Sequence, residues 1–176
     1  MSEQGWETEF RAVWIRAVKA YEAGRDRPET CIPASDRSFL ESLGVTAQEL
    51  FDFAEDWVGY SDPTLDEVVA LTSIQRDYFL TDRAGKPPGP RRDSRSLPAK
   101  TDQVDGIAWL PRLIVKARLK LAGELPPDLM YGCGGDRPFL RRMRIGLAEF
   151  LQKVRDSHGN DRLLIEFVKE RSGLLK

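Results

Sequence analysis

Two cysteine–aspartate pairs are the residues of this sequence whose types and spacing could do chemistry. Cys31 precedes Asp36, and Cys133 precedes Asp136. Each cysteine lies just before an expected helix N-terminus, whose positive end can favour a nucleophilic thiolate. A cysteine nucleophile usually needs a nearby base, and the single histidine, His158, falls in an apparent turn. Because buried free cysteines are common packing residues, we assign both a structural role and predict no catalytic residue.

The two aspartates and a later glycine-rich loop have simpler explanations than catalysis. Pseudo-symmetry could bring Asp36 and Asp136 together as an acid/base pair. Each also stands where it could cap an apolar helix, and we favour capping. Two cysteines and one histidine are fewer than the four ligands of a structural zinc site, so we predict no metal. The order of Gly132, Gly134 and Gly135 fits neither the Walker nor the dinucleotide fingerprint, so we predict no cofactor.

Basic residues in the second half of the chain could bind an anion. Arg112 and Lys116 are four residues apart, as are Arg137 and Arg141, so each pair shares a helix face. The functional hypothesis is that these four residues, with Arg142 beside them, line a groove for a carboxylate or phosphate near two helix N-termini. The simpler explanation is that they form a solvated face or dock onto the acidic first half.

Charge is distributed very unevenly along the chain. Residues 1–80 contain 7 Lys+Arg and 16 Asp+Glu, a net charge of -9, whereas residues 81–176 contain 20 and 12, a net charge of +8. Together they give the net charge of -1 for the whole chain. Segregation of this size can steer partners, or hold the two halves against each other.

The elements that must position these residues are helices. Apolar positions recur with helical spacing over residues 6–21, 39–43, 50–58, 65–72, 109–121, 139–143, 147–154 and 164–168. Residues 25–34 have the composition of a loop, and residues 81–105, with four prolines, that of a linker or extended arm. We therefore predict an all-α fold: an acidic helical module over 1–80, a Pro/Arg-rich connector over 81–105 and a basic helical module over 106–176.

Particular residues mark where helices should begin and end. Gly24 and Gly123 can end helices in left-handed caps, and Gly59 can end another. The segment Thr46–Glu49 is a capping-box sequence. Pro63 is expected at the first position of a helix, where its missing N–H costs nothing.

The two halves agree in the order of these landmarks. In each, an amphipathic helix ends at a glycine, a loop with one cysteine follows, and an Asp-Arg pair precedes Phe-Leu. The corresponding residues are Gly24 and Gly123, Cys31 and Cys133, Asp36 and Asp136, and Phe39 and Phe139. We predict two tandem, pseudo-repeated modules that share this structural motif.

The second half, from about Lys86 to Gly173, resembles a family of small bacterial proteins catalogued as domain of unknown function five-zero-six-nine. The resemblance rests on Pro87-Pro88…Pro90-Arg91, Gly106 before Leu110-Pro111-Arg112, Lys116-Ala117-Arg118, Leu121-Ala122-Gly123, and Cys133 with Asp136 and Phe139-Leu140. The first half is similar to a divergent copy. The resemblance implies an all-α module and no particular activity.

Composition and charge favour a binding function in the cytoplasm. The chain is 41% hydrophobic and 9% aromatic, which is too aromatic for a disordered protein. No apolar run approaches the ~20 residues that span a bilayer, and the N-terminus lacks the features of a secretory signal. Two cysteines fit a reducing compartment, where we expect both to stay reduced.

We therefore favour a non-enzymatic binding or adaptor protein that uses the basic second module, with the first module as a regulator or support. Its partner would be a protein or an anionic ligand that the sequence does not name. Two alternatives stay open: a nucleic-acid or phosphate binder, which we do not favour, and an enzyme that uses Cys133 with Asp136. Steep salt dependence would identify the first, and a reactive thiol the second.

Overall fold

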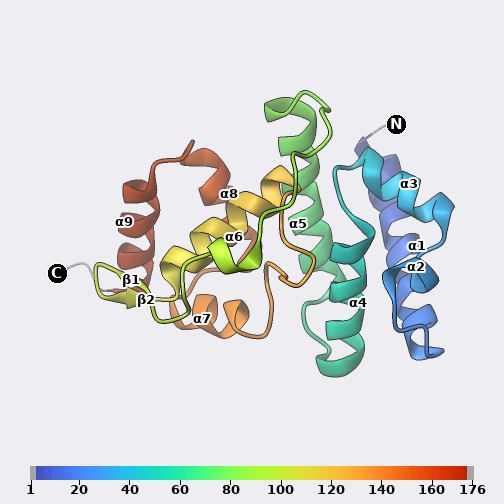
Figure 1. Cartoon of the computed structure of the whole chain (residues 1–176), viewed down its shortest axis with the longest axis horizontal. Coiled ribbons are helices and arrows are strands. Elements are labelled where there is room, and N and C mark those ends of the chain that lie inside the picture. Colours follow the sequence, from blue (N-terminus) through green and yellow to red (C-terminus); the bar gives the residue numbers. More distant parts are fainter. Residues whose placement is uncertain (1–2, 174–176) are drawn as a thin grey trace. The chain divides into compact units, whose positions relative to one another are not determined.

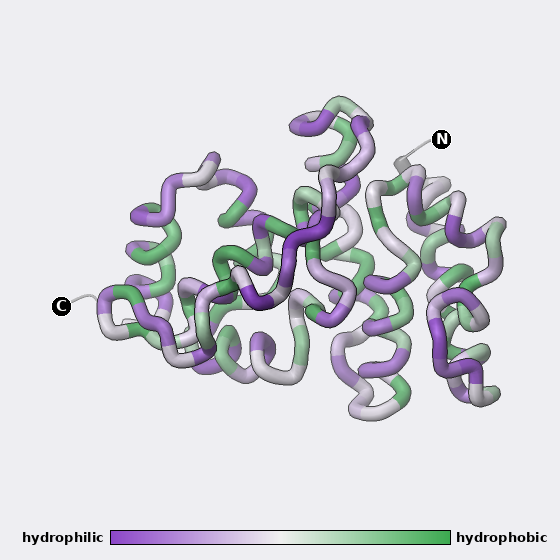
Figure 2. The backbone as a smooth tube through the Cα atoms, viewed as in Figure 1, coloured by the Kyte–Doolittle hydropathy of each residue, from purple (hydrophilic) through white to green (hydrophobic). Residues whose placement is uncertain are grey.

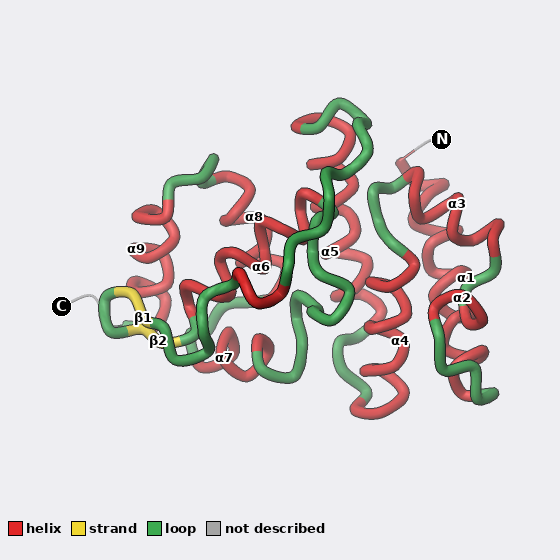
Figure 3. Tube along the Cα trace, in the orientation of Figure 1, coloured by secondary structure: helices red, strands yellow, loops and turns green. Residues whose placement is uncertain are grey.

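The computed structural model describes residues 3–173 of the chain (Figure 1). Its contacts divide the chain into two compact units, Met1–Gly85 and Lys86–Lys176. Apart from one two-stranded hairpin, the regular structure of the described residues is helical (Figure 3), so the fold is all-α, as the periodicity predicts. Among the described helices, none combines the length and the apolar character that a membrane-spanning segment requires.

The first unit is organised around its longest helix, α1. The inner face of α1 carries Phe10, Val13 and Ala17, each at most 1% exposed, and packs against α4 and α5. Figure 2 shows hydrophobic and hydrophilic residues alternating along the helices, as expected when amphipathic helices enclose a core. The elements of this unit are α1 (Glu3–Glu22), α2 (Pro28–Cys31), α3 (Ala34–Ser42), α4 (Ala47–Tyr60), α5 (Leu65–Asp77) and a π-helical turn, η1 (Tyr78–Asp82).

The second unit is organised around α6 in the same way. Leu110, Leu113 and Ala117 of α6 are fully buried, and the helix packs against α8 and against the first strand of the hairpin. Val104 pairs with Ile107 in that antiparallel hairpin. The elements are a 3-10 turn, η2 (Ser94–Ser96), β1 (Gln103–Val104), β2 (Ile107–Ala108), α6 (Leu110–Ala122), α7 (Asp136–Arg142), α8 (Leu147–Asp156) and α9 (Asp161–Ser172).

Asp36 does not cap α3 as predicted. The helix begins two residues earlier, at Ala34, with Pro33 in the N-cap position. Asp36 lies in the first turn, and its carboxylate accepts two hydrogen bonds from Arg16, each 2.9 Å long. Local sequence rules assign the Asp36 carboxylate to the helix cap, but it accepts hydrogen bonds from Arg16 in another helix instead.

Two capping boxes begin the next helices of the first unit. The box predicted at Thr46 and Glu49 is present at the start of α4. A second box, Thr64 with Glu67, begins α5, so Pro63 precedes the helix and the prediction that it opens the helix is wrong. The threonine hydroxyl can accept a backbone N–H bond, which a proline side chain cannot, and this fixes the cap at residue 64.

Two smaller predictions also need correction. The helix expected to end at Gly59 continues to Tyr60, and Ser61 with φ 55° provides the left-handed cap. The segment predicted as a loop after Gly24 contains the short helix α2, which starts at a proline. Gly24 itself has φ 84°, as expected of a residue that ends a helix.

The segment predicted as a linker or arm contributes contacts to the second unit. The backbone N–H of Arg92 donates to the Glu124 carbonyl (3.1 Å), and Leu97 is 7% exposed. Further along, the Arg112 guanidinium donates to the Pro98 carbonyl (2.7 Å). These bonds tie the proline-rich segment to the loop after α6 and to α6 itself.

The turn after α3 and the turn after α7 have matching backbone hydrogen bonds. Val45 donates to the Leu40 carbonyl and Ile145 to the Leu140 carbonyl, both at 3.0 Å. The residue before each donor has a positive φ, 72° in the first turn and 58° in the second. This local agreement is what the predicted repeat requires; the duplication itself stays a prediction.

Candidate functional site

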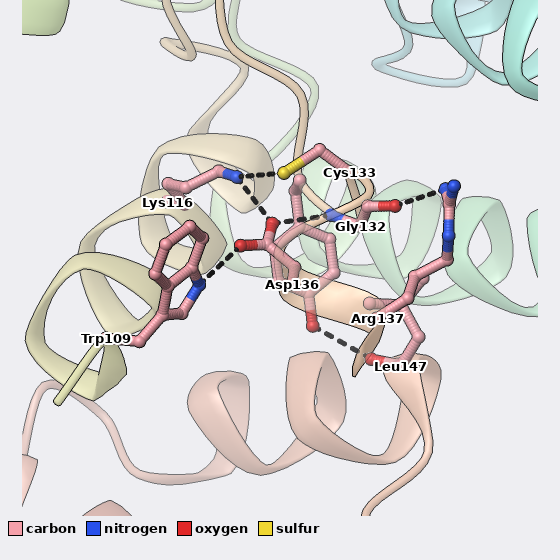
Figure 4. Close-up of polar contacts among 8 residues, drawn as sticks. Trp109, Lys116, Gly132, Cys133, Asp136, Arg137 and Leu147 are labelled. Atoms are coloured by element: carbon pink, nitrogen blue, oxygen red, sulfur yellow. Dashed lines mark hydrogen bonds and ion pairs between the residues drawn. The ribbon is translucent and has the colours of Figure 1, made fainter. Parts of the chain in front are cut away.

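The carboxylate of Asp136 is the centre of a buried polar cluster in the second unit. The residue is 0% exposed, and its carboxylate accepts hydrogen bonds from Lys116 Nζ (2.5 Å), Trp109 Nε1 (3.0 Å) and the Gly132 backbone N–H (2.9 Å). Figure 4 shows these donors converging on the carboxylate from different sides. A buried carboxylate is stable only with such partners, and here both of its oxygens have them.

Three elements position the members of this cluster. Trp109 is the N-cap residue of α6, and Lys116 lies two turns further along that helix. Gly132 belongs to the loop after α6, and Asp136 is the first residue of α7. The Asp136 carboxylate therefore joins α6 to α7 and to the loop between them.

Asp136 is not the N-cap of α7, so the capping interpretation is wrong here too. Gly135 occupies the N-cap position and makes no side-chain cap. The backbone N–H group that donates to the Asp136 carboxylate belongs to Gly132, four residues earlier, and not to the helix that Asp136 begins. The ammonium group of Lys116 on α6 is the stronger partner, because it forms a buried ion pair with Asp136. Such a pair compensates the cost of desolvation only when both groups are fully hydrogen-bonded.

Trp109 is held in an unusual backbone conformation. Its φ is 73°, a value that non-glycine residues rarely adopt. Its backbone N–H donates to the Asp102 carbonyl (3.2 Å). Gly135 packs against its ring so closely that an added Cβ would lie 2.4 Å from Trp109 Cζ2. Glycine is therefore required at 135 for the indole to reach Asp136.

Cys133 completes the cluster. Its sulfur lies 3.3 Å from Lys116 Nζ, so the lysine nitrogen contacts both the sulfur and the Asp136 carboxylate. The Lys116 side chain is 3% exposed, whereas Cys133 is half-buried. We call Trp109, Lys116, Gly132, Cys133 and Asp136 the Asp136 cluster. Chemically, it places the sulfur of a half-buried cysteine in direct contact with the nitrogen of a buried lysine.

Two further side chains fix the loop that carries Cys133. Arg137 is 7% exposed and donates to the Gly132 carbonyl (2.6 Å). Tyr131 is 1% exposed and donates its hydroxyl proton to the Leu147 carbonyl (2.8 Å), at the start of α8. Complete burial raises the pKa of Tyr131 well above its usual value, so the phenol stays protonated. The hydrogen bonds of Tyr131 and Arg137 therefore hold the loop at residues 131 and 132.

The first unit also has an ion pair between a basic residue and an aspartate of a helix's first turn, in a different environment. It joins Arg16 to Asp36, and the Arg16 side chain is 47% exposed. The hydrogen bond to Asp36, with a second to Glu9, raises the pKa of Arg16. Cys31 is buried and its sulfur donates to the Ala17 carbonyl (3.1 Å). Burial raises the pKa of this thiol, which disfavours the reactive thiolate.

The five predicted anion-binding residues have different surroundings. The charged groups of Lys116 and Arg137 have the internal partners given above, and Arg112 binds the Pro98 carbonyl. Arg141 and Arg142, at the C-terminal end of α7, are exposed. Anion binding itself stays a prediction. Of the five residues, Arg141 and Arg142 on α7 are the ones whose exposure would let an anion approach.

Sequence reasoning gave Tyr131 no role, treated Trp109 only as an apolar helix position and Gly132 only as part of a glycine-rich loop. It also missed the burial of Lys116. One signal was available for the lysine. Lys116 and Lys120 follow Leu113 by three and seven residues, so both fall within the apolar spacing of α6, and both are 2% exposed. A lysine in an apolar stripe needs a buried partner, which is a reason to look for a carboxylate such as Asp136.

The comparisons with known proteins bear on this unit alone. A family model described as a domain of unknown function (DUF5069) matches residues 94–174. No curated protein and no solved structure matches the chain. The matched residues run from the 3-10 turn η2 through α9 and include the whole Asp136 cluster. The second half of the chain therefore matches the DUF5069 family over residues 94–174, which include the quoted residues from Gly106 to Leu140 but not those at 87–91.

Proposed function

We propose that the chain is a non-enzymatic binding protein whose second unit engages an acidic segment of a partner protein. The observation that supports this is a contact between two arginines: Arg171 Nη2 donates to the Arg144 carbonyl (3.1 Å). This contact brings the end of α9 beside the residues that follow α7. Arg142 and Arg144 are exposed, and the Arg171 side chain is 46% exposed. We call Arg142, Arg144 and Arg171 the arginine surface.

The arginine surface suits a carboxylate-rich partner. Arg171 is paired with Glu149 (3.2 Å), and the Arg142 guanidinium lies over the Phe139 ring, 5.8 Å from its centroid. Guanidinium groups bind carboxylates with two parallel hydrogen bonds, which adds direction to the charge attraction. The net charge of +8 over residues 81–176 would add attraction at longer range.

A protein partner fits this surface better than a nucleic acid. A duplex binder typically contacts about 6–10 phosphates, which needs an extended basic track. The three residues of the arginine surface are fewer than such a track requires and suit a short acidic peptide segment. Nucleic-acid binding is therefore an outcome that the experiment below must distinguish.

The geometry also favours binding over catalysis by Cys133 with Asp136. Lys116 Nζ lies between the sulfur and the carboxylate and is bonded to both. Asp136 is thus placed to orient the lysine and not to take a proton from the cysteine, which a general base would have to do.

The test is a titration followed by fluorescence anisotropy. A labelled polyglutamate peptide and a labelled oligonucleotide are each titrated with wild-type protein, with Arg142→Glu/Arg144→Glu, and with Arg25→Glu/Arg27→Glu. The last variant changes the net charge equally but at exposed residues of the first unit. The proposal expects the wild type and the control to bind the peptide, and the Arg142/Arg144 variant to lose at least tenfold in affinity. Equal affinity of all three proteins, or tighter binding of the oligonucleotide by the wild type, would overturn it.

A further inference from the structure

The contact between Lys116 and Cys133 joins a half-buried cysteine to a buried lysine. Cys133 Sγ and Lys116 Nζ are 3.3 Å apart. Cys133 is half-buried, whereas Cys31 is buried, so Cys133 is the cysteine nearer to solvent. The Lys116 side chain is 3% exposed and donates to the Cys133 sulfur from α6. In Figure 4 the lysine nitrogen points at the sulfur from α6. A nitrogen so placed can attack the sulfur on the side away from solvent.

We propose that Cys133 and Lys116 are an oxidant-responsive pair, which forms a covalent sulfur–nitrogen link when the protein meets a peroxide. This role is separate from the binding function proposed above and does not depend on the arginine surface. The contact between the two side chains favours it, because the lysine nitrogen already lies 3.3 Å from the sulfur that a peroxide would oxidise.

The reaction has two steps. In the first, the Cys133 thiol reacts with hydrogen peroxide; the sulfur gains a hydroxyl group to become a sulfenic acid, the O–O bond breaks, and one water is released. In the second, the Lys116 ammonium first gives one proton to Asp136, and the resulting amine attacks the sulfur. The S–N bond forms, and the hydroxyl leaves as water with a second proton from the nitrogen. Sulfur is oxidised by the two electrons that reduce the peroxide, and the protein loses two hydrogen atoms overall.

Asp136 accepts the first of these protons. Its carboxylate lies 2.5 Å from Lys116 Nζ, so the proton can be transferred directly and then passed to solvent. The product no longer contains the ammonium group, and Asp136 keeps only its bonds to Trp109 and Gly132 among the donors described above. Oxidation therefore removes the ion pair between α6 and α7. A thiol reductant cleaves the S–N bond and restores both side chains.

Cys31 is an internal control. Its sulfur donates to a backbone carbonyl, and burial both blocks access and raises the pKa of the thiol. No reaction of this kind is expected there, because an inaccessible thiol with little thiolate character is a poor nucleophile.

In the experiment, the whole protein is treated with increasing amounts of hydrogen peroxide. The products are analysed by intact mass and by tryptic peptide mapping, with and without dithiothreitol. The expected product is lighter by two hydrogen atoms. Its map contains the peptide with Lys116 joined to the peptide with Cys133, and dithiothreitol reverses the change. Trypsin does not cut after the linked lysine. A wild-type protein that only gains oxygen on Cys133, or in which Cys31 reacts first, would overturn the proposal.

Lys116→Arg is the matched variant. It keeps a positive charge beside Asp136, but a guanidinium is a poor nucleophile, so the oxidised sulfur should continue to sulfinic acid and the protein should gain oxygen. The same loss of two hydrogen atoms in this variant would show that Lys116 is not the partner. If Lys116→Arg fails to fold, the peptide map of the wild type still decides, because it locates the link directly.

Discussion

Lys116 Nζ and Asp136 Oδ2 lie 2.5 Å apart, with 3% and 0% of the two side chains exposed. Two charges this deeply buried are stable only as a pair, since each would cost several kcal/mol alone. The pair therefore makes the positions of α6, α7 and the loop between them depend on one another. It also sets the geometry in which Cys133 meets the lysine nitrogen.

Loss of one partner should be far more costly here than at the surface. We expect Asp136→Ala to lower the free energy of unfolding by about 3–5 kcal/mol, because it leaves the Lys116 charge buried and unpaired. The measurement is urea unfolding followed by circular dichroism. The control is Asp161→Ala, which removes an ion pair of equal length, Arg118–Asp161, with side chains 34% and 58% exposed; about 0–1 kcal/mol is expected there. Similar losses in both variants would contradict a structural role for the buried pair.

Neighbouring glycines should differ in their tolerance of alanine. An added Cβ at Gly135 would lie 2.4 Å from the Trp109 ring, whereas nothing lies within 4 Å of one at Gly134. We expect Gly135→Ala to destabilise by about 1–3 kcal/mol, because the indole must move away from Asp136. Gly134→Ala should change stability by less than about 1 kcal/mol. Thermal melts of the two variants compare them directly, and a neutral Gly135→Ala would mean that the indole is free to shift.

Arg144 occupies the left-handed region, with φ 58°, where the matching turn of the first unit has Gly44. Replacing Arg144 with glycine should stabilise the protein by about 1 kcal/mol, because glycine adopts this conformation without the Cβ clash. Arg144→Ala removes the same side chain but keeps the clash, so it separates backbone strain from lost contacts. Unfolding free energies of Arg144→Gly that do not exceed those of Arg144→Ala would refute the strain argument.

Asp52 should make the first unit less stable as pH rises. Burial is the main cause that raises its pKa, a hydrogen bond from Gln48 lowers it, and the nearby carboxylates of Glu49, Glu55 and Asp56 raise it; together they bring the pKa to about 7. The folded pKa lies above the unfolded value near 3.8, so the folded state holds a proton that the unfolded state has lost. The stabilisation is present below the unfolded pKa and is lost as pH rises through about 7.

The matched variant is Asp52→Asn, which cannot ionise. Between about pH 4 and pH 8, we expect it to remove a decline in the unfolding free energy on the order of 2–4 kcal/mol. The measurement is urea unfolding of both proteins across this range. Parallel curves for wild type and variant would show that Asp52 titrates normally.

The sequence predicts the helices better than it predicts the buried cluster. Helical spacing found the all-α fold, and the Thr46–Glu49 box was found because its two bonds lie within one turn. Asp36 and Asp136 were misassigned as caps because local rules cannot account for donors 20 or more residues away, such as Arg16 and Lys116. The indole of Trp109 was missed for the same reason, being 27 residues from Asp136. In each of these cases, hydrogen-bond partners far away in the sequence determine the role of the side chain.

The salt dependence of peptide binding tests the central claim most directly. If the arginine surface binds an acidic partner through charge, the affinity of wild-type protein for a polyglutamate peptide must fall steadily as sodium chloride is raised, because added ions screen exposed charges. The account predicts a moderate fall for the wild type and for Arg25→Glu/Arg27→Glu, and a much smaller one for Arg142→Glu/Arg144→Glu. Equal salt dependence of all three proteins, or wild-type binding that does not respond to salt, would contradict the proposed function.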